Sequence, residues 1–224
     1  MVKTTATDAR PEGLRLIIPT RYGLQDSACW LSWMQLERPR GMPWGWLLKQ
    51  DLDGAGAHGM RNMMVAEVRA KRDPEWYFLI DDDTIVPADA VLKMLRSGEK
   101  IVAGAYAMRR HGEATCLIPA GKQSAKMDWR AGEPFYGYAA AGCMLVHRDV
   151  FDGLRSPWFE DPADTGMDEG IRFCRKAEEI GHKCLIDTSI LCGHVVRDGL
   201  ESVKPQRIIW PCPTESVPEM ESRP

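Results

Sequence analysis

Short apolar runs alternate with helical segments over the first half of the chain, and this alternation constrains the fold more than any other feature. Four apolar runs are predicted to be strands, at residues 14–19, 44–49, 76–80 and 100–105. The segments between them have the pattern of helices, at 25–37, about 60–72 and from Pro87 to Gly98. Strand–helix–strand repeats at this spacing are typical of βαβ units. The sequence therefore predicts an α/β fold with a mostly parallel central sheet flanked by helices.

The second half of the chain is less regular. Residues 108–134 are predicted to be a loop, with an edge strand as the alternative. Ordered segments then follow, at 138–146 (an apolar run), 149–154 (a short helix), 168–180 (a helix) and 183–186 (a strand). Five prolines lie in the last twenty residues. We expect one domain over residues 1–200 and an irregular, Pro-rich C-terminal tail over 201–224.

Composition narrows the class of protein. The chain has 224 residues, 44% of them hydrophobic, which is ample for a core. Its net charge of −3 gives no support for a general nucleic-acid-binding surface, although it does not exclude nucleic acid as a substrate. The seven cysteines include no Cys-x-x-Cys pair and several fall in apolar runs, which favours buried free thiols in a reducing compartment. With no signal-peptide pattern and no apolar stretch of membrane-spanning length, we expect a cytoplasmic location.

Three consecutive aspartates, Asp81, Asp82 and Asp83, follow the apolar strand at 76–80. Ligands of open α/β sheets bind at the carboxyl ends of strands, so these carboxylates lie where a ligand is expected. Three adjacent like charges repel each other, and a bound cation is the simplest relief. With the two-residue period of a strand, Asp81 and Asp83 are predicted to point to one side and Asp82 to the other.

The three aspartates have three competing interpretations. A helix cap before Pro87 explains one aspartate but not three behind a buried strand. An EF-hand loop does not fit, because Ile85 and Val86 stand where a third acidic ligand and a glycine are needed. A haloacid-dehalogenase-like phosphohydrolase, with Asp81 as its nucleophile, stays open as an alternative function, although two strands precede this one.

An ordered set of residues resembles a known family. The set runs through Pro19-Thr20, Arg61-Asn62, Phe78 to Asp83 with Pro87, Gly142 to Val146 with Phe151, Ser156 to Phe159, Asp168-Glu169 before Phe173-Cys174, Gly181, Asp187 to Ser189 and Gly193 to Val195. In this order the residues resemble glycosyltransferases of the GT-A fold, which is Rossmann-like, close to family 2 and its phage and bacterial relatives. The resemblance covers roughly residues 14–196.

The resemblance implies a site for a nucleotide-diphospho-sugar, expected to be a UDP-sugar, together with Mn²⁺ or Mg²⁺. Asp81 and Asp83 look like the Asp-x-Asp motif that holds the metal against the diphosphate, with His194 as a further metal ligand. The residues that the resemblance implies for donor binding are Pro19, Thr20, Arg21, Asp51, Arg61, Asp81, Asp82 and Gly142, with Asp53 as the alternative to Asp51. Arg61 has a competing interpretation as an ordinary solvated charge on a helix.

Asp168 and Glu169 resemble the acidic pair that accepts the proton of the acceptor hydroxyl in an inverting transfer. A helix N-terminus also favours carboxylates for structural reasons, so capping is an alternative for one of them. Which of the two is the base stays open here, and so does a non-catalytic module that only binds nucleotide sugar. The acceptor is left as a protein, a small molecule, a lipid-linked sugar or modified DNA, and the oligomeric state is left unknown.

Overall fold

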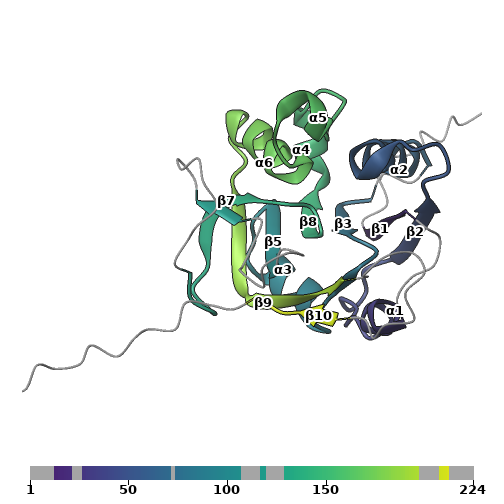
Figure 1. The fold of residues 1–224 in the computed structure, drawn as a ribbon. Helices are drawn as coiled ribbons and strands as arrows, with labels where there is room; N and C mark the ends of the chain where they lie inside the picture. The colour runs from purple at the N-terminus through teal and green to yellow at the C-terminus, as the bar shows by residue number, and fades with distance from the viewer. Residues whose placement is uncertain are drawn as a thin grey trace, which may run out of the picture.

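A central sheet runs through the molecule, with helices on both of its faces (Figure 1). The computed structural model describes residues 13–21, 27–71, 74–106, 117–119, 129–196 and 207–211. The strands are β1 (Leu14–Thr20), β2 (Trp44–Gln50), β3 (Trp76–Ile80), β4 (Thr84–Ile85), β5 (Ile101–Tyr106), β6 (Leu117–Pro119), β7 (Phe135–Ala139), β8 (Cys143–His147), β9 (Cys184–Val196) and β10 (Arg207–Ile209). The helices are α1 (Ser27–Met34), α2 (Gly56–Lys71), α3 (Ala90–Arg96), α4 (Arg148–Gly153), α5 (Pro162–Thr165) and α6 (Glu169–Glu179).

The strand order is β2-β1-β3-β8-β5-β9-β7-β6. β1 is parallel to both β2 and β3, and β5 is parallel to β9. β8 lies antiparallel between β3 and β5, so β2, β1, β3, β5 and β9 all run in the same direction. The predicted α/β fold with a sheet that is mostly parallel at its core is therefore confirmed.

Strand residues alternate between two apolar layers. Ile17 and Leu79 belong to the layer that includes α2, α4 and α6, which lie above the sheet in Figure 1. Leu16 and Phe78 belong to the opposite layer, which includes α1 and α3. Because successive side chains of a strand point to opposite faces, a strand covered by helices on both faces is apolar throughout. This is why the runs in β1 and β3 show no polar alternation in the sequence.

Three segments differ from their predictions. The apolar run at 138–146 contains the end of β7, a turn and the start of β8, because both strands are buried and their boundary leaves no polar residue in the sequence. The strand predicted at 183–186 continues to Val196 as β9. In the tail, residues 207–209 form β10, which pairs with β9, so this described part of the tail is not irregular. The edge-strand alternative within 108–134 corresponds to β6, at 117–119.

Five of the cysteines lie in the described residues and all five are buried free thiols: Cys29, Cys143, Cys174, Cys184 and Cys192. A hydrogen bond to Cys174, together with burial, raises the pKa of the Cys184 thiol, and Cys143 does the same for Cys192. The two other cysteines, at 116 and 212, lie outside the described residues. Among the helices that the structure describes, none has both the length and the apolar character needed to cross a bilayer.

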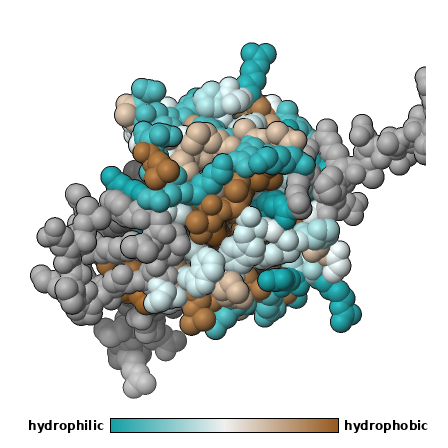
Figure 2. Space-filling view, turned by 90° about the vertical axis from the view of Figure 1, so that its right-hand side faces the viewer, coloured by the Kyte–Doolittle hydropathy of each residue, from teal (hydrophilic) through white to brown (hydrophobic). Residues whose placement is uncertain are grey.

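The face that carries α1, β2 and α2 exposes apolar side chains (Figure 2). Hydrophobic surface in the middle of this view is bordered by hydrophilic surface. Trp30, Leu31 and Met34 on α1 are about half exposed, at 46%, 58% and 55%. Trp30 also contacts Trp46 of β2, with ring centroids 6.1 Å apart. An apolar outer face on α1 is unusual for a helix that covers a sheet.

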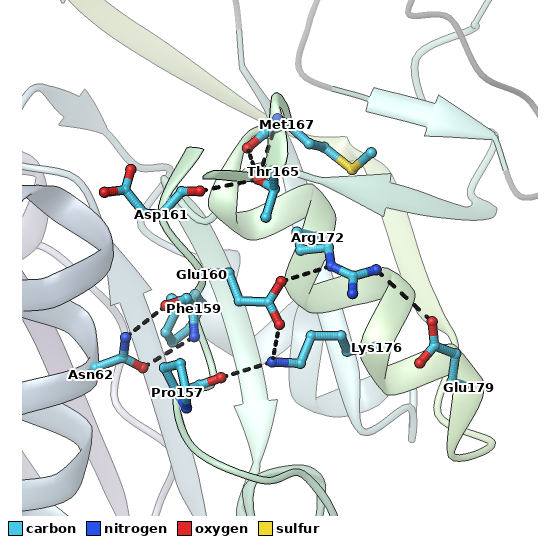
Figure 3. Close-up of polar contacts among 10 residues, drawn as sticks. All are labelled: Asn62, Pro157, Phe159, Glu160, Asp161, Thr165, Met167, Arg172, Lys176 and Glu179. Atoms are coloured by element: carbon cyan, nitrogen blue, oxygen red, sulfur yellow. Dashed lines mark hydrogen bonds and ion pairs between the residues drawn. The ribbon is translucent and has the colours of Figure 1, made fainter. Parts of the chain in front are cut away.

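The segment before α5 connects α2 to α6 (Figure 3). Asn62 of α2 accepts hydrogen bonds from the amides of Trp158 and Phe159 at 3.0 and 3.1 Å, and donates to the Phe159 carbonyl at 2.7 Å. Glu160 binds two side chains of α6: its Oε2 accepts from Arg172 at 2.9 Å, and its Oε1 lies 2.8 Å from Lys176 Nζ. Residues 158–160 therefore connect the body of α6 to α2.

The Glu160 pairs predict a pH-dependent contribution to stability. The hydrogen bond from Lys176, followed by that from Arg172, lowers the pKa of Glu160. A carboxylate with a lowered folded-state pKa stabilises the fold above its unfolded pKa of about 4.3, and loses this effect as the pH falls through the folded pKa. We expect Glu160→Gln to lower the free energy of unfolding by about 1 kcal/mol at pH 7. The difference from the native chain should shrink toward zero as the pH is lowered to about 3.

Urea unfolding of both proteins across this pH range measures the effect. The matched control is Glu179→Gln, because Glu179 is more exposed and lies 3.9 Å from the same Arg172. We expect no pH-dependent difference for the control. A Glu160→Gln difference that is the same at both ends of the range would contradict the prediction.

Candidate functional site

A cleft of about 420 Å³ opens at the carboxyl ends of β1, β2 and β3. The lining residues come from these three strand ends and from the start of α2: Pro19, Thr20, Arg21, Asp51, Gly54, Gly56, Ala57, Met60, Asp81, Asp82 and Asp83. Parallel strands end at the same edge of a sheet, so residues that are far apart in the sequence meet there. The cleft is therefore a direct consequence of the β2-β1-β3 order.

Asp81 lies directly after β3 and is held by both its backbone and its side chain. Its amide donates to the Gly142 carbonyl at 3.1 Å, and its Oδ1 accepts from Nη2 of Arg61. Gly142 thus supports Asp81 from the turn that precedes β8. The other guanidinium nitrogen of Arg61, Nη1, donates to Glu169.

The three aspartates do not continue the strand. The chain turns after Ile80, with the Thr84 amide donating to the Asp81 carbonyl at 3.2 Å. The two-residue period therefore ends at β3, and Asp81 and Asp83 bind different partners. Asp82 Oδ2 accepts from the Arg21 amide at 3.1 Å, which joins the ends of β1 and β3.

Asp83 lies beside His194, with Oδ2 and Nε2 3.3 Å apart. Both residues are 8% exposed. The pairing of β4 with β9 sets this contact, because Thr84 faces His194 across the ladder and the Val195 amide donates to the Asp83 carbonyl at 2.8 Å. The long strand β9 therefore brings a residue from late in the chain beside Asp83, which lines the cleft.

Asp51, at the end of β2, closes the other side of the cleft. Its two carboxylate oxygens accept from the amides of Ala55 and Gly56, each at 2.8 Å. These backbone hydrogen bonds, that from Ala55 first, lower the pKa of Asp51. The side chain thus occupies amides at the start of α2 that would otherwise be available to an anion.

Asp168 and Glu169 begin α6 and have different partners. Asp168 is the N-cap, and its Oδ1 accepts from the amides of Gly170 and Ile171 at 2.9 and 3.2 Å. Glu169 is 13% exposed and binds Arg61. The two carboxylates are therefore adjacent, but only Glu169 has a cationic side chain bound to it among these contacts.

Burial and like charges change the acidity of this group. Burial raises the pKa of Asp81 to about 6, Arg61 opposes the rise, and the charges of Asp83, Glu169 and Asp168 add to it. Burial also raises the pKa of Asp168, with a further contribution from Glu169. Four carboxylates thus act on one another across a small region, which is typical of functional sites.

The structure brings most of the sequence-predicted residues together. Pro19, Thr20, Arg21, Asp51 and the three aspartates line one cleft, and Arg61 links it to the acidic pair of α6. Gly142 contributes its backbone beside Asp81 and does not line the cleft. Gly54, Gly56, Ala57 and Met60 also line the cleft and were not predicted from the sequence. The glycines of the 51–59 loop were the available signal, since Gly54 and Gly56 both have positive φ, at 72° and 69°.

The predicted metal ligands are only partly assembled. Asp83 and His194 touch, whereas Asp81 faces Arg61, and no group of three or more potential ligands occurs among the described residues. The chemistry still fits a hard divalent cation, because Mg²⁺ commonly uses one or two carboxylates and completes its shell with substrate phosphates. A carboxylate beside an imidazole also suits Mn²⁺.

Comparisons with known proteins agree with this architecture. No protein-family model matches the chain, and no curated protein sequence matches it significantly. Among solved structures, A197 from STIV matches with a TM-score of 0.58 at 11% identity, over 83% of this chain and 86% of that one. TarS of S. aureus matches with a TM-score of 0.50 at 10% identity, over 78% of this chain but only 35% of TarS.

A structure of TarS residues 1–349 in complex with UDP also matches, with a TM-score of 0.49 that is too low to add to the argument. At these identities the matches show the fold alone. The chain has a GT-A-like fold, in agreement with the resemblance found in its sequence.

The contact between α6 and the turn before β8 predicts how the free energy of unfolding changes when one methyl group is added at Gly170. A Cβ on Gly170 would lie 2.4 Å from the Ala141 nitrogen and 2.7 Å from the Ala140 carbonyl carbon, and backbone atoms cannot move away easily. Alanine favours helices by about 1 kcal/mol over glycine, but this clash outweighs that gain. We expect Gly170→Ala to lower the free energy of unfolding by about 2 kcal/mol.

The control for this prediction is Gly153→Ala, in α4. A Cβ there would meet the end of the Ile180 side chain at 2.8 Å, and a flexible side chain can move. Chemical unfolding should show a smaller loss for Gly153→Ala than for Gly170→Ala. Equal effects would indicate that the helix start does not depend on this close approach.

Proposed function

We propose that this chain is a glycosyltransferase that moves a sugar from a nucleotide-diphospho-sugar to an acceptor hydroxyl. The observation that carries the proposal is the cleft at the ends of three parallel strands, with Asp81, Asp82 and Asp83 on one side and Pro19, Thr20 and Arg21 beside them. The GT-A-like fold supports it independently, because the fold was matched without reference to these side chains.

The cleft suits a donor in two respects. Its volume of about 420 Å³ falls in the range of small-molecule sites. The ends of β1 and β2 offer Thr20, Arg21 and Asp51 for the base and ribose, while the aspartates lie at the opposite strand end, where a diphosphate would bind through a cation. We take UDP-sugars as the first donors, following the resemblance in sequence.

We further propose that the transfer depends on Mn²⁺ or Mg²⁺, held by Asp83 with His194 beside it and Asp81 nearby. A divalent cation supplies positive charge against the diphosphate that leaves the sugar. The protein's own contribution is to hold the carboxylates in place: the Asp83 carbonyl is bound by the Val195 amide, and the Asp81 amide is bound to Gly142.

Between the two acids of α6, the contacts favour Asp168 as the proton acceptor. Glu169 is bound to Arg61, whereas both amide hydrogen bonds of Asp168 go to Oδ1 and leave Oδ2 for an acceptor hydroxyl. The pKa of Asp168 is raised by its burial, and a stronger base accepts a proton more readily at neutral pH. A base on the acceptor side is the arrangement that an inverting transfer needs.

The first prediction of this proposal concerns binding. Asp83→Asn should weaken the metal-dependent binding of UDP at least about tenfold, which corresponds to about 1.4 kcal/mol, because a neutral amide is a poorer cation ligand. Titration calorimetry with UDP, in the presence and absence of Mn²⁺, measures the change. The control is Asp164→Asn, which makes the same substitution at an exposed residue of α5 that does not line the cleft.

We expect the Asp164→Asn protein to bind UDP as the native chain does. Metal-dependent binding that survives in Asp83→Asn would contradict the assignment of Asp83. Release of inorganic phosphate with a phosphorylated Asp81 would contradict the whole proposal and favour the phosphohydrolase alternative.

The second prediction separates catalysis from helix capping. Asparagine caps a helix about as well as aspartate, so Asp168→Asn should keep nearly native stability. The same change removes the proton acceptor and should lower kcat about 10²–10⁴-fold. Thermal unfolding and the release of nucleoside diphosphate from a panel of donors measure the two effects. Nucleotide binding with no turnover in the native chain would instead indicate a non-catalytic binding module.

A further inference from the structure

One guanidinium joins two carboxylates that come from opposite sides of the candidate site. Arg61 lies in the second turn of α2, and its side chain is 1% exposed. Its Nη2 donates to Asp81 and its Nη1 donates to Glu169. These partners are 20 and 108 residues away in the sequence, so the arrangement exists only in the folded chain.

Because Arg61 is buried, its guanidinium needs both carboxylate partners. A charged group with so little exposure to water is stable only where opposite charges and hydrogen bonds replace its hydration. Arginine suits this position because its planar guanidinium presents donors in a fixed fork. Lysine would keep the charge but offer a single ammonium group, which cannot hold two carboxylates in the same fixed geometry.

Backbone contacts connect the same two carboxylates by a second route. The Asp81 amide donates to Gly142, and the neighbouring Ala140 and Ala141 lie directly against Gly170 at the start of α6. The end of β3, the turn before β8 and the start of α6 are therefore in continuous contact. Arg61 connects the two ends of this unit through side chains.

A second arginine on the same helix provides a comparison. Arg69 also binds one aspartate, Asp152, and lies over the ring of Trp158 at 5.7 Å. It is more exposed than Arg61, at 22% of its side chain, and lies two turns farther along α2. Arg69 therefore shows that α2 also forms an ion pair away from the candidate site. The ion pairs of Arg61 differ because they join the end of β3 to the start of α6.

We propose that Arg61 is a positioning residue that holds Asp81 and Glu169, and with Glu169 the adjacent Asp168, in one fixed arrangement. The end of β3 that faces the donor and the start of α6 that accepts the proton then stay aligned. This inference rests on the proposed function, since it assigns Asp81 to the donor and Asp168 to the acceptor.

Hydrogen exchange of the full chain without any ligand tests the arrangement. In Arg61→Lys, we expect amide exchange at least about tenfold faster in both 81–86 and 168–172, with 64–70 near its native rate, because one guanidinium holds both segments. In the control Arg69→Gln, both segments should exchange as in the native chain. Faster exchange in one segment only, or in α2 alone, overturns the inference.

Glu169→Gln provides a second test that leaves Arg61 in place. We expect amide exchange in 81–86 to be faster in this variant as well. The Arg61 guanidinium is then bound by one carboxylate only, and it holds Asp81 less firmly. The exchange rate of Glu169→Gln tests the positioning role of Arg61 even where the Arg61 variants do not fold. A native exchange rate in 81–86 of a folded Glu169→Gln protein overturns the inference.

Steady-state kinetics with a UDP-sugar provides a readout that a purely structural role would not move. We expect Arg61→Lys to lower kcat at least about tenfold while the donor KM changes less than threefold. A folded Arg61→Lys protein with native kcat, or with a change in KM alone, overturns the inference. A native chain that binds no nucleotide and turns over no donor would overturn the proposed function, and the exchange experiment would still decide the role of Arg61.

Discussion

Three parallel strands, β2, β1 and β3, end at one edge of the sheet, and the candidate site depends on this convergence. Polar residues that need hydrogen-bond partners lie at each strand end: Thr20 and Arg21 at the end of β1, Asp51 after β2, and the aspartates after β3. The partners come from neighbouring strand ends and helix starts, as when the Asp51 amide donates to Thr20 at 2.7 Å and Asp82 accepts from Arg21. The hydrogen bonds that terminate the strands thereby also shape the cleft.

The acidic residues of the candidate site carry more negative charge than the nearby guanidinium neutralises. The charges of Asp83, Glu169 and Asp168 act on Asp81, and Arg61 is the guanidinium bound to Asp81 and Glu169. One positive charge does not balance four carboxylates. Burial raises the pKa of Asp81, and the neighbouring carboxylates raise it further. An excess of negative charge in a partly buried region also attracts a cation, and the proposed metal is consistent with this imbalance.

Much of the central fold could be predicted from the sequence because the relevant signals are local. β1, β3 and β5 are short apolar runs with clear ends, and α6 has a capping Asp168 and a terminal Gly181. The break between β7 and β8 could not be predicted, because buried strands and a small-residue turn give one unbroken apolar pattern. The start of α2 at Gly56 is also earlier than predicted, because Asp51, at the end of the preceding β2, accepts from the amides of Ala55 and Gly56 across the loop.

Arg61 shows most clearly where prediction from the sequence stops. On a helix that also carries Arg69 and Lys71, an arginine has the pattern of an ordinary solvated charge, although Met64, Val65 and Val68 lie on the same helix face and are buried. Arg61 is enclosed because Glu169, more than a hundred residues later in the chain, binds it. The position of Glu169 is set in turn by the contact of Gly170 with the turn before β8.

The same reasoning explains why His194 reaches Asp83. β9 pairs with β5 as far as Asp187, shifts register, and pairs with β5 again up to Cys192. It then pairs with β4, which places His194 opposite Thr84. Local patterns therefore identify which residues have the chemistry for a site, whereas the pairing of distant strands and helices decides which of them meet. In this chain the local sequence pattern and the pairing of distant elements both place the candidate site at the end of β3.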